Sequence, residues 1–281
     1  MNEACPAPGI HVVPVRTPTL PPATHTNTYV VGEGRLTVFD PASPWEDEQQ
    51  RLARVLEDRE ATGERVERIV LTHHHGDHVG GAEALRARFS RDGRSISIAA
   101  HAETAARVGA HIRVDAILAD GQSIDCGGRT LQSAFTPGHA PGHLVFVDRD
   151  SGAVVAGDMV AGVGTILIDP IDGDLGLYLA SLERMKGLAP SVLLPAHGPP
   201  LTNAVALLSF YIAHRHQRTE QVRSALDRLG SASPADLVPA VYPHLAPEAH
   251  FVAEVQITSH LLWMVAHGLA RKGPRARFDK A

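Results

Sequence analysis

Between residues 28 and 203 the chain alternates short apolar runs rich in Val, Ile and Thr with stretches of helical periodicity. Gly and Pro turns separate these segments. Strands that interleave with helices favour an α/β fold with buried sheets. The apolar runs predict strands over 28–31, 36–39, 68–71, 95–99, 130–135, 144–147, 153–156 and 192–194, and the periodic stretches predict helices over 45–61, 80–89 and 178–186.

The pattern changes after Leu201, where no further strand run of comparable strength occurs. Apolar residues instead recur at helical spacing, which predicts helices over 205–228, from Ser233 and Pro234 onward, and over 247–270. We therefore expect two domains, residues 1–203 and 204–281. Three helices and a basic tail suggest a winged-helix-like second domain, whereas helices that cap the main domain or form a homodimer surface are at least as well supported.

Composition limits the location of the protein. Hydrophobic residues make up 44% of the 281 residues and charged residues 20%, as in a globular protein. The chain has no run of roughly 18 apolar residues, and its first twenty residues lack the pattern of a secretory signal. We expect a cytoplasmic protein with no membrane partner. Its two cysteines, Cys5 and Cys126, form no close ligand pair, so any metal chemistry lies elsewhere.

Charge is unevenly distributed along the chain. The net charge is -5, yet residues 204–281 hold nine Lys and Arg against six Asp and Glu. An anionic partner would explain this excess, but solvated helix surfaces explain it more simply and are favoured.

The densest cluster of polar side chains runs from His73 to His78 and directly follows the apolar run 69–71. On a chain that leaves a strand, alternate side chains point to the same side, so we expect His73 and His75 to face one point and His74 to face away. Asp77 and His78 then turn toward a second point. Imidazole and carboxylate are ligands that suit zinc.

Three more polar residues follow apolar strands in the same way. His139 comes after the run 131–135, Asp158 after 154–157 and His197 after 192–196. Taken alone, each has a structural explanation: a turn histidine, a helix-capping aspartate and a loop histidine. Their repeated placement predicts that all three project toward a common rim.

This arrangement resembles the metallo-β-lactamase superfamily, whose His-x-His-x-Asp-His motif is matched here within residues 73–78. The resemblance covers about residues 20–203 and implies an αββα sandwich with two metal ions at one edge. It also implies that Asp158 bridges the two ions. By the same resemblance, one ion is bound by His73, His75 and His139, and the other by Asp77, His78 and His197.

Two cations that share a water molecule lower its pKa enough to supply a bridging hydroxide near neutral pH. We expect two zinc ions, with iron or manganese as alternatives, because the same nitrogen and oxygen ligands accept them. Asp77 is the candidate catalytic residue, since it can orient the water or accept its proton. His143 is a candidate for orienting a metal ligand, with proton donation to the leaving group and a turn role as alternatives.

The resemblance and the composition together limit the range of candidate substrates. Asp158 argues against a β-lactamase, because the zinc β-lactamases usually have Cys or Ser at that position. Glyoxalase II, which hydrolyses hydroxyacylglutathione thioesters, has the same seven ligand types. A related group of endoribonucleases carries a C-terminal winged-helix-like domain, which residues 211–218 resemble except for a missing acidic residue. Aromatic residues make up only 5% of the chain, so few side chains are available to stack on RNA bases, which favours a small substrate over RNA.

These observations leave three hypotheses open. The favoured one is hydrolysis of a small-molecule ester or thioester, and the second is cleavage of single-stranded RNA. The third is a metal-bearing binding module without catalysis, which a complete open metal site makes the weakest.

Overall fold

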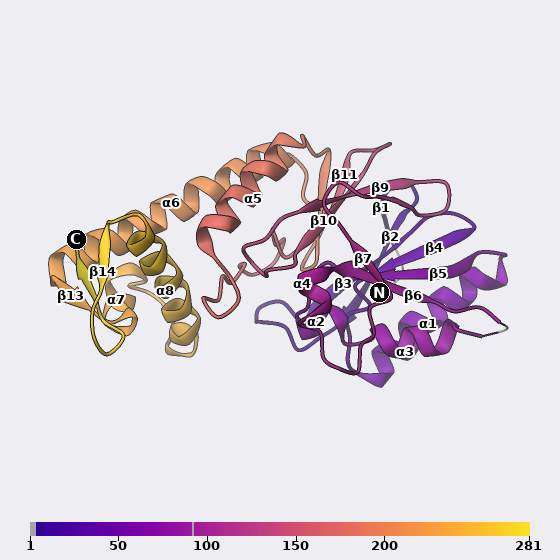
Figure 1. Ribbon diagram of the computed structural model, residues 1–281, viewed down its shortest axis with the longest axis horizontal. Helices are drawn as coiled ribbons and strands as arrows, with labels where there is room; N and C mark the ends of the chain where they lie inside the picture. Colours follow the sequence, from indigo (N-terminus) through magenta and orange to yellow (C-terminus); the bar gives the residue numbers. More distant parts are fainter. Residues whose placement is uncertain (1–3, 92) are drawn as a thin grey trace. The chain divides into compact units, whose positions relative to one another are not determined.

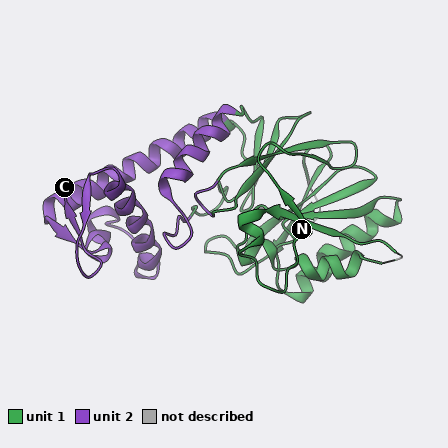
Figure 2. Cartoon of the chain, in the orientation of Figure 1, with its two compact units in different colours: residues 1–136, 141–166, 188–204 green, residues 137–140, 167–187, 205–281 purple. Residues whose placement is uncertain are grey.

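The computed structural model describes residues 4–91 and 93–281, which group into two compact units (Figure 2). Unit 1 comprises residues 1–136, 141–166 and 188–204, and unit 2 comprises residues 137–140, 167–187 and 205–281. The sequence predicts a single domain boundary after residue 203. In the structure, unit 2 also takes in two earlier segments, one of which carries His139.

The larger sheet of unit 1 has seven strands in sequential order (Figure 1). Its first four strands are antiparallel, whereas β4 to β7 are parallel. The strands are β1 (Ala4–Ala7), β2 (Ile10–Arg16), β3 (His25–Val31), β4 (Arg35–Phe39), β5 (Arg65–Val70), β6 (Ser97–His101) and β7 (Ala116–Leu118).

The smaller sheet of unit 1 has the order β12-β11-β10-β9-β8. Only β11 and β12 are paired in parallel, but β9 and β11 also run in the same direction because both are antiparallel to β10. The strands are β8 (Ser123–Asp125), β9 (Thr130–Phe135), β10 (Leu144–Asp148), β11 (Ala153–Gly157) and β12 (Val192–Pro195).

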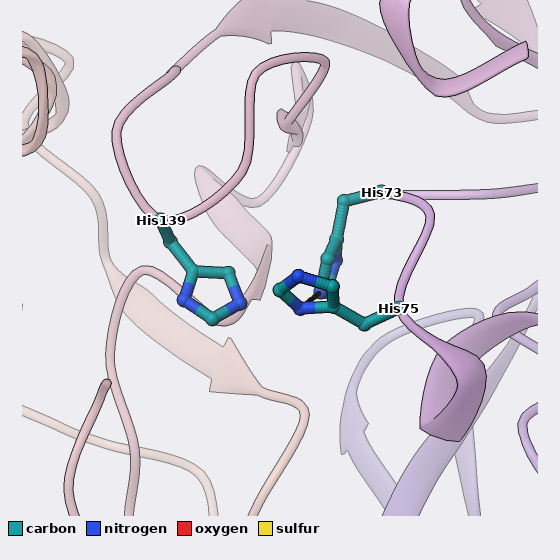
Figure 3. Close-up of side chains that lie close together, drawn as sticks. All are labelled: His73, His75 and His139. Atoms are coloured by element: carbon teal, nitrogen blue, oxygen red, sulfur yellow. Dashed lines mark hydrogen bonds between the residues drawn. The ribbon is translucent and has the colours of Figure 1, made fainter. Parts of the chain in front are cut away.

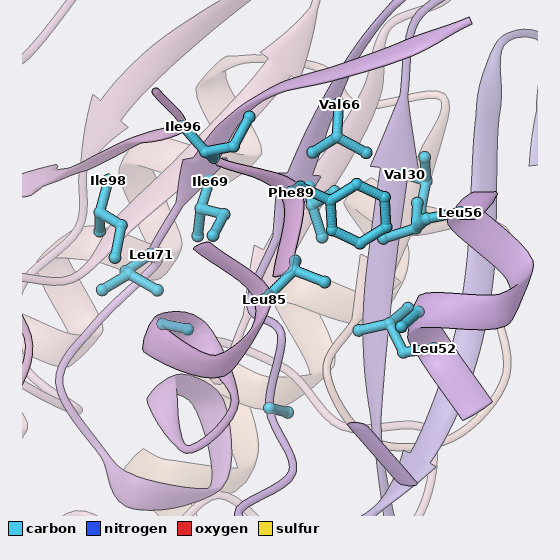
Figure 4. Close-up of a cluster of buried hydrophobic side chains, with 14 of the residues drawn as sticks. Val30, Leu52, Leu56, Val66, Ile69, Leu71, Leu85, Phe89, Ile96 and Ile98 are labelled. Atoms are coloured by element: carbon cyan, nitrogen blue, oxygen red, sulfur yellow. The ribbon is translucent and has the colours of Figure 1, made fainter. Parts of the chain in front are cut away.

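The two sheets pack face to face around a shared apolar core. Phe39 of the larger sheet contacts Phe146 of the smaller one, with ring centroids 5.0 Å apart. A second core fills the outer face of the larger sheet, where Leu56 and Phe89 pack against Ile69 (Figure 4). The helices on that face are α1 (Glu46–Ala61) and α3 (Ala82–Phe89), and the short helices are α2 (Gly76–Val79) and α4 (Ala102–Ala105).

The predicted α/β sandwich is therefore confirmed, with strands that the sequence did not predict. β2 was missed because Pro14 interrupts its apolar run, and a proline usually argues against an internal strand. Here Pro14 lies opposite Asn27 in the pairing of β2 with β3.

Unit 2 contains both helices and a small sheet. The sequence shows no strong strand run after Leu201, yet unit 2 contains three strands there, because strands of two or three residues are too short to show alternation. Among the described residues, no helix has the length and apolarity needed to cross a membrane. The elements are α5 (Leu175–Gly187), α6 (Ala204–Leu229), β13 (Ser231–Ala232), α7 (Pro234–Val241), η1 (Pro247–Ala249), α8 (His250–Ala266), β14 (Ala270–Lys272) and β15 (Phe278–Lys280), with the sheet order β13-β15-β14.

The apolar interior of unit 2 encloses one histidine. His260 on α8 is fully buried, and its Nδ1 lies 2.8 Å from the hydroxyl of Thr219 on α6. That hydroxyl also donates to the carbonyl oxygen of Arg215, so it accepts from Nδ1 of the imidazole. Nε2 is buried and makes no hydrogen bond to any described residue. Burial, assisted by the positive charge of Arg215, lowers the pKa of His260 from 6.5 to about 3.

This buried imidazole predicts acid-sensitive folding of unit 2. Because the folded pKa lies below the unfolded one, the unfolded chain binds the extra proton between these values, and stability is lost as the pH falls below about 6.5. We expect a contribution of up to about 1.4 kcal/mol per pH unit to the free energy of unfolding. Urea unfolding of chelator-treated protein between pH 5 and 7.5, followed by tryptophan fluorescence, measures it. His260→Gln should flatten this dependence relative to the wild type, whereas His244→Gln, at an exposed position, should not. Equal slopes for all three proteins would contradict the assignment.

Candidate metal centre

Four of the candidate metal ligands lie just beyond the ends of strands. His73 follows β5, Asp158 immediately follows β11, and His197 follows β12. His139 lies four residues beyond β9, which runs in the same direction as β11. The carboxyl ends of strands that run in one direction share one edge of a sheet, which is where side chains from distant parts of the sequence meet.

The structure brings all seven predicted ligands into groups whose donor atoms lie within 4.8 Å of one another. One group is His73, His75 and His139, whose rings face one another in Figure 3. A further group, His74, His75 and Asp172, contains the histidine that the sequence predicted to face away. The remaining two groups share His78. They are His73, His78 and Asp158, and Asp77, His78 and His197.

Asp158 lies between two imidazoles. Its Oδ1 is 3.5 Å from Nε2 of His78 and 3.4 Å from Nε2 of His197. These separations exceed those of good charge-assisted hydrogen bonds and suit donor atoms that share a cation. Nε2 of His197 also lies 3.7 Å from Oδ2 of Asp77.

The electrostatics of this cluster keep the carboxylate ionised. Burial alone raises the pKa of Asp158, but the imidazoles of His78 and His197 outweigh burial and hold that pKa well below its ordinary value. Burial lowers the pKa of His78, but Asp158 and Asp40 outweigh burial and raise that pKa well above its ordinary value. A divalent cation would take over the role of the imidazole protons, because it offers the carboxylate a larger charge.

Three of the histidines form a hydrogen bond through Nδ1 to an acceptor that belongs to none of the ligand groups. Nδ1 of His139 lies 2.8 Å from the carbonyl oxygen of Leu167, and Nδ1 of His197 lies 2.9 Å from that of His25. Nδ1 of His78 lies 2.9 Å from Oδ2 of Asp40. Because a carbonyl or carboxylate oxygen can only accept, these contacts put the proton on Nδ1 and leave the Nε2 lone pair for a metal.

Asp40 is the residue that the sequence analysis missed. It is buried directly after β4, and it accepts hydrogen bonds from the backbone N and the hydroxyl of Thr72 at 2.8 and 2.6 Å. Its backbone φ of 47° lies in the left-handed region, which Asp tolerates better than most residues. The placement of Asp40 after the apolar run 36–39 is the same pattern that singled out Asp158, so the pattern could have identified it.

His143 belongs to none of these groups. It is fully buried, and its Nε2 accepts a hydrogen bond from the backbone N of Asp158 at 3.2 Å. Its Nδ1 lies 3.0 Å from the hydroxyl of Thr136. Gly157 must lack a side chain here, because a Cβ would lie 2.5 Å from Nε2 of His143. Among the three roles considered for His143, this geometry favours orientation of a neighbouring ligand.

Similar proteins with curated names include hydrolases. The chain is 33% identical over 205 residues to the lactamase-like protein adaB of Aspergillus niger, covering 72% of this chain and 59% of that protein. It is 32% identical to the thioesterase pkgB of Emericella nidulans, covering 72% and 54% respectively. It is 36% identical to a hydroxyacylglutathione hydrolase of Acidiphilium cryptum, covering 63% and 65%. The chain thus spans little more than half to two thirds of the length of these relatives.

Solved structures share the fold. A beta-lactamase domain protein from Burkholderia ambifaria superimposes with a TM-score of 0.86 at 22% identity, covering 100% of this chain and 94% of that one. The protein TTHA1429 from Thermus thermophilus superimposes with a TM-score of 0.80 at 23% identity, covering 98% and 99%. The model of the metallo-beta-lactamase superfamily matches residues 21–197, which include all seven clustered ligands. The chain therefore belongs to the metallo-beta-lactamase superfamily.

Proposed function

We propose that the protein is a binuclear metal-dependent hydrolase that acts on a small ester or thioester. The observation that carries this proposal is the convergence of the seven ligands in three groups that overlap through His73 and His78. The donor set of five imidazoles and two carboxylates suits divalent cations. The carboxylates of Asp77 and Asp158 also face the imidazoles of His78 and His197 at 3.4 to 3.7 Å, which is too long for good charge-assisted hydrogen bonds. Bound cations would supply a water of lowered pKa and would polarise the scissile carbonyl.

The residues around the site would orient these ligands and move a proton. Asp40 and the carbonyl oxygens of His25 and Leu167 hold three imidazoles in the tautomer that presents Nε2. The Asp77 side chain keeps 18% of its surface exposed, so it can reach a water molecule and accept its proton. His143 holds the backbone at Asp158 and so fixes the carboxylate between the two imidazoles.

We propose zinc as the metal, with iron or manganese as alternatives, because nitrogen and oxygen ligands accept all three. A cytoplasmic location is part of the same proposal. Both cysteines, exposed Cys5 and buried Cys126, are free thiols, which suits a reducing compartment.

A thioester or ester is the favoured substrate because of the named relatives. The thioesterase pkgB and the hydroxyacylglutathione hydrolase both hydrolyse acyl bonds according to their names. With metal bound, hydrolysis of an acyl bond would need no serine or cysteine nucleophile, because the water of lowered pKa would serve as the nucleophile.

RNA cleavage is the second candidate, and the order of elements in unit 2 is what favours it. Helix, strand, two helices and a two-stranded hairpin follow one another, as in a winged helix. The hairpin region is basic, with Arg271, Lys272 and Arg275. However, α8 contains no Lys or Arg, although a helix that tracks phosphates normally carries several.

Two of the four arginines of α6 are also engaged within unit 2. Arg215 is buried and donates to Gln256, and Arg218 donates to the carbonyl oxygen of Val241. These guanidinium groups are committed to internal contacts, so unit 2 offers a phosphate backbone fewer cations than its net charge suggests.

Replacing Asp158 tests the metal cluster. We expect Asp158→Asn to bind fewer metal equivalents than the wild type and to lose at least about 100-fold in turnover, because a neutral amide replaces the charged carboxylate that lies between His78 and His197. Metal analysis after gel filtration and steady-state kinetics measure both effects. Asp150→Asn, an exposed position, is the matched control. An unchanged turnover number in Asp158→Asn would refute the cluster as the catalytic centre.

Replacing Asp40 tests the support of His78. We expect Asp40→Asn to weaken metal binding by about 10- to 100-fold, because an amide is a poorer acceptor for Nδ1 of His78 and binds Thr72 less well. Competition with a chromogenic chelator measures the affinity. Asp58→Asn, exposed on α1, should match the wild type. If both variants bind metal equally, Asp40 has no role in orienting the imidazole.

A side-by-side assay distinguishes the substrates. We expect the zinc-loaded protein to hydrolyse S-D-lactoylglutathione or a generic ester such as p-nitrophenyl acetate faster than it cleaves single-stranded RNA, with all activity lost in Asp158→Asn. Spectrophotometry and gel analysis of labelled RNA give the rates. RNA cleavage that exceeds acyl hydrolysis would overturn the small-substrate proposal and favour the second candidate.

A further inference from the structure

The loop that carries His139 is held by unit 2. Residues 137–140 group with unit 2, although Thr136 and Pro141 on either side belong to unit 1. The hydroxyl of Ser181 on α5 donates to the carbonyl oxygen of Pro137 at 2.7 Å. The backbone N of Asp174 donates to the carbonyl oxygen of Gly138 at 2.8 Å. Both partners lie in unit 2, the unit to which the loop itself belongs, so these hydrogen bonds fix the loop within that unit.

Close packing reinforces this anchor. Gly138 has a φ of 129°, and a Cβ on it would lie 2.1 Å from the backbone N of Tyr178 on α5. Only glycine allows the loop to approach the helix so closely. The loop therefore has little freedom to move relative to α5.

The side chain of His139 is held by the next segment of unit 2. Its Nδ1 donates to the carbonyl oxygen of Leu167 at 2.8 Å, and the adjacent residue, Ile168, is fully buried. The carbonyl oxygen of Ile168 accepts a hydrogen bond from the hydroxyl of Ser259 on α8. Ser259 is buried as well, and it lies 91 residues away in sequence.

The two contacts act on neighbouring peptide units. The two peptide units are joined at the Cα of Ile168, so only φ and ψ of this residue let the Leu167 carbonyl turn relative to the fixed Ile168 carbonyl, and the Ile168 side chain is fully buried. The hydroxyl of Ser259 also lies 3.3 Å from the carbonyl oxygen of Val255 in its own helix. It thus links α8 directly to the segment that orients a proposed metal ligand.

We propose that Ser259 is a positioning residue for the metal site. It holds the segment 167–168 so that the Leu167 carbonyl keeps the proton on Nδ1 of His139 and directs Nε2 toward His73 and His75. The C-terminal unit then has a role in metal binding that does not depend on any nucleic acid. This inference rests on the proposed metal-dependent hydrolase function.

Ser259→Ala in the full chain tests this role, with Ser209→Ala as the matched control. Ser209 lies on α6 of the same unit and donates to the carbonyl oxygen of Val205 in its own helix, but it is exposed. Two quantities are measured. Chelator competition gives the affinity for each of the two zinc equivalents, and the cobalt-substituted protein gives a visible absorption spectrum. We expect Ser259→Ala to weaken one of the two equivalents by about 10- to 100-fold and to alter the cobalt spectrum. The second equivalent and the Ser209→Ala variant should match the wild type.

A second variant, Ser181→Ala, acts on the same loop through a different contact, and it decides the question if Ser259→Ala fails to fold. The same selective loss of one equivalent supports the role of unit 2. The inference is overturned if both equivalents bind as in the wild type, or if both are weakened together. A wild-type protein that binds no metal would instead overturn the proposed function itself.

Discussion

The carboxyl ends of β5, β9, β11 and β12 are the points from which the proposed ligands leave the two sheets. Two apolar layers of unit 1 keep these ends in register. One lies between the sheets and includes the contact of Phe39 with Phe146, and the other joins the larger sheet to α1 and α3. A slip of one residue in any of these strands would turn a ligand away from the cluster, because side chains alternate between faces. The hydrophobic core therefore determines the geometry of the polar site.

Groups outside the ligand cluster determine which ring nitrogen of three histidines carries the proton. Asp40 and two backbone carbonyls accept the Nδ1 protons of three histidines, and His143 accepts from the backbone at Asp158. A backbone carbonyl is an acceptor that substitution of its own side chain does not remove. The arrangement therefore fixes which nitrogen of each ring faces the cation position, and less reorganisation of the rings is needed when a cation replaces the imidazole protons.

Within unit 2, His139 is held by a backbone segment rather than by charged side chains. Its α8 carries no Lys or Arg, and the arginines Arg215 and Arg218 of α6 are used internally. What α8 does provide is Ser259, whose hydroxyl holds the segment beside His139. Such a packing contact is a structural use of α8 that needs no nucleic acid.

The sequence alone determined the α/β class, the ligand types and their placement after strands, because periodicity and strand-end position are local properties of the chain. His73, Asp158 and His197 were identifiable for that reason, and Asp40 could have been found by the same rule. The short strands β13 to β15 and the proline-interrupted β2 carry too weak a local pattern. Only the tertiary structure decided that Leu167 orients His139 and that Ser259 holds the neighbouring carbonyl, since hydrogen bonds between residues far apart in the chain depend on how the elements pack.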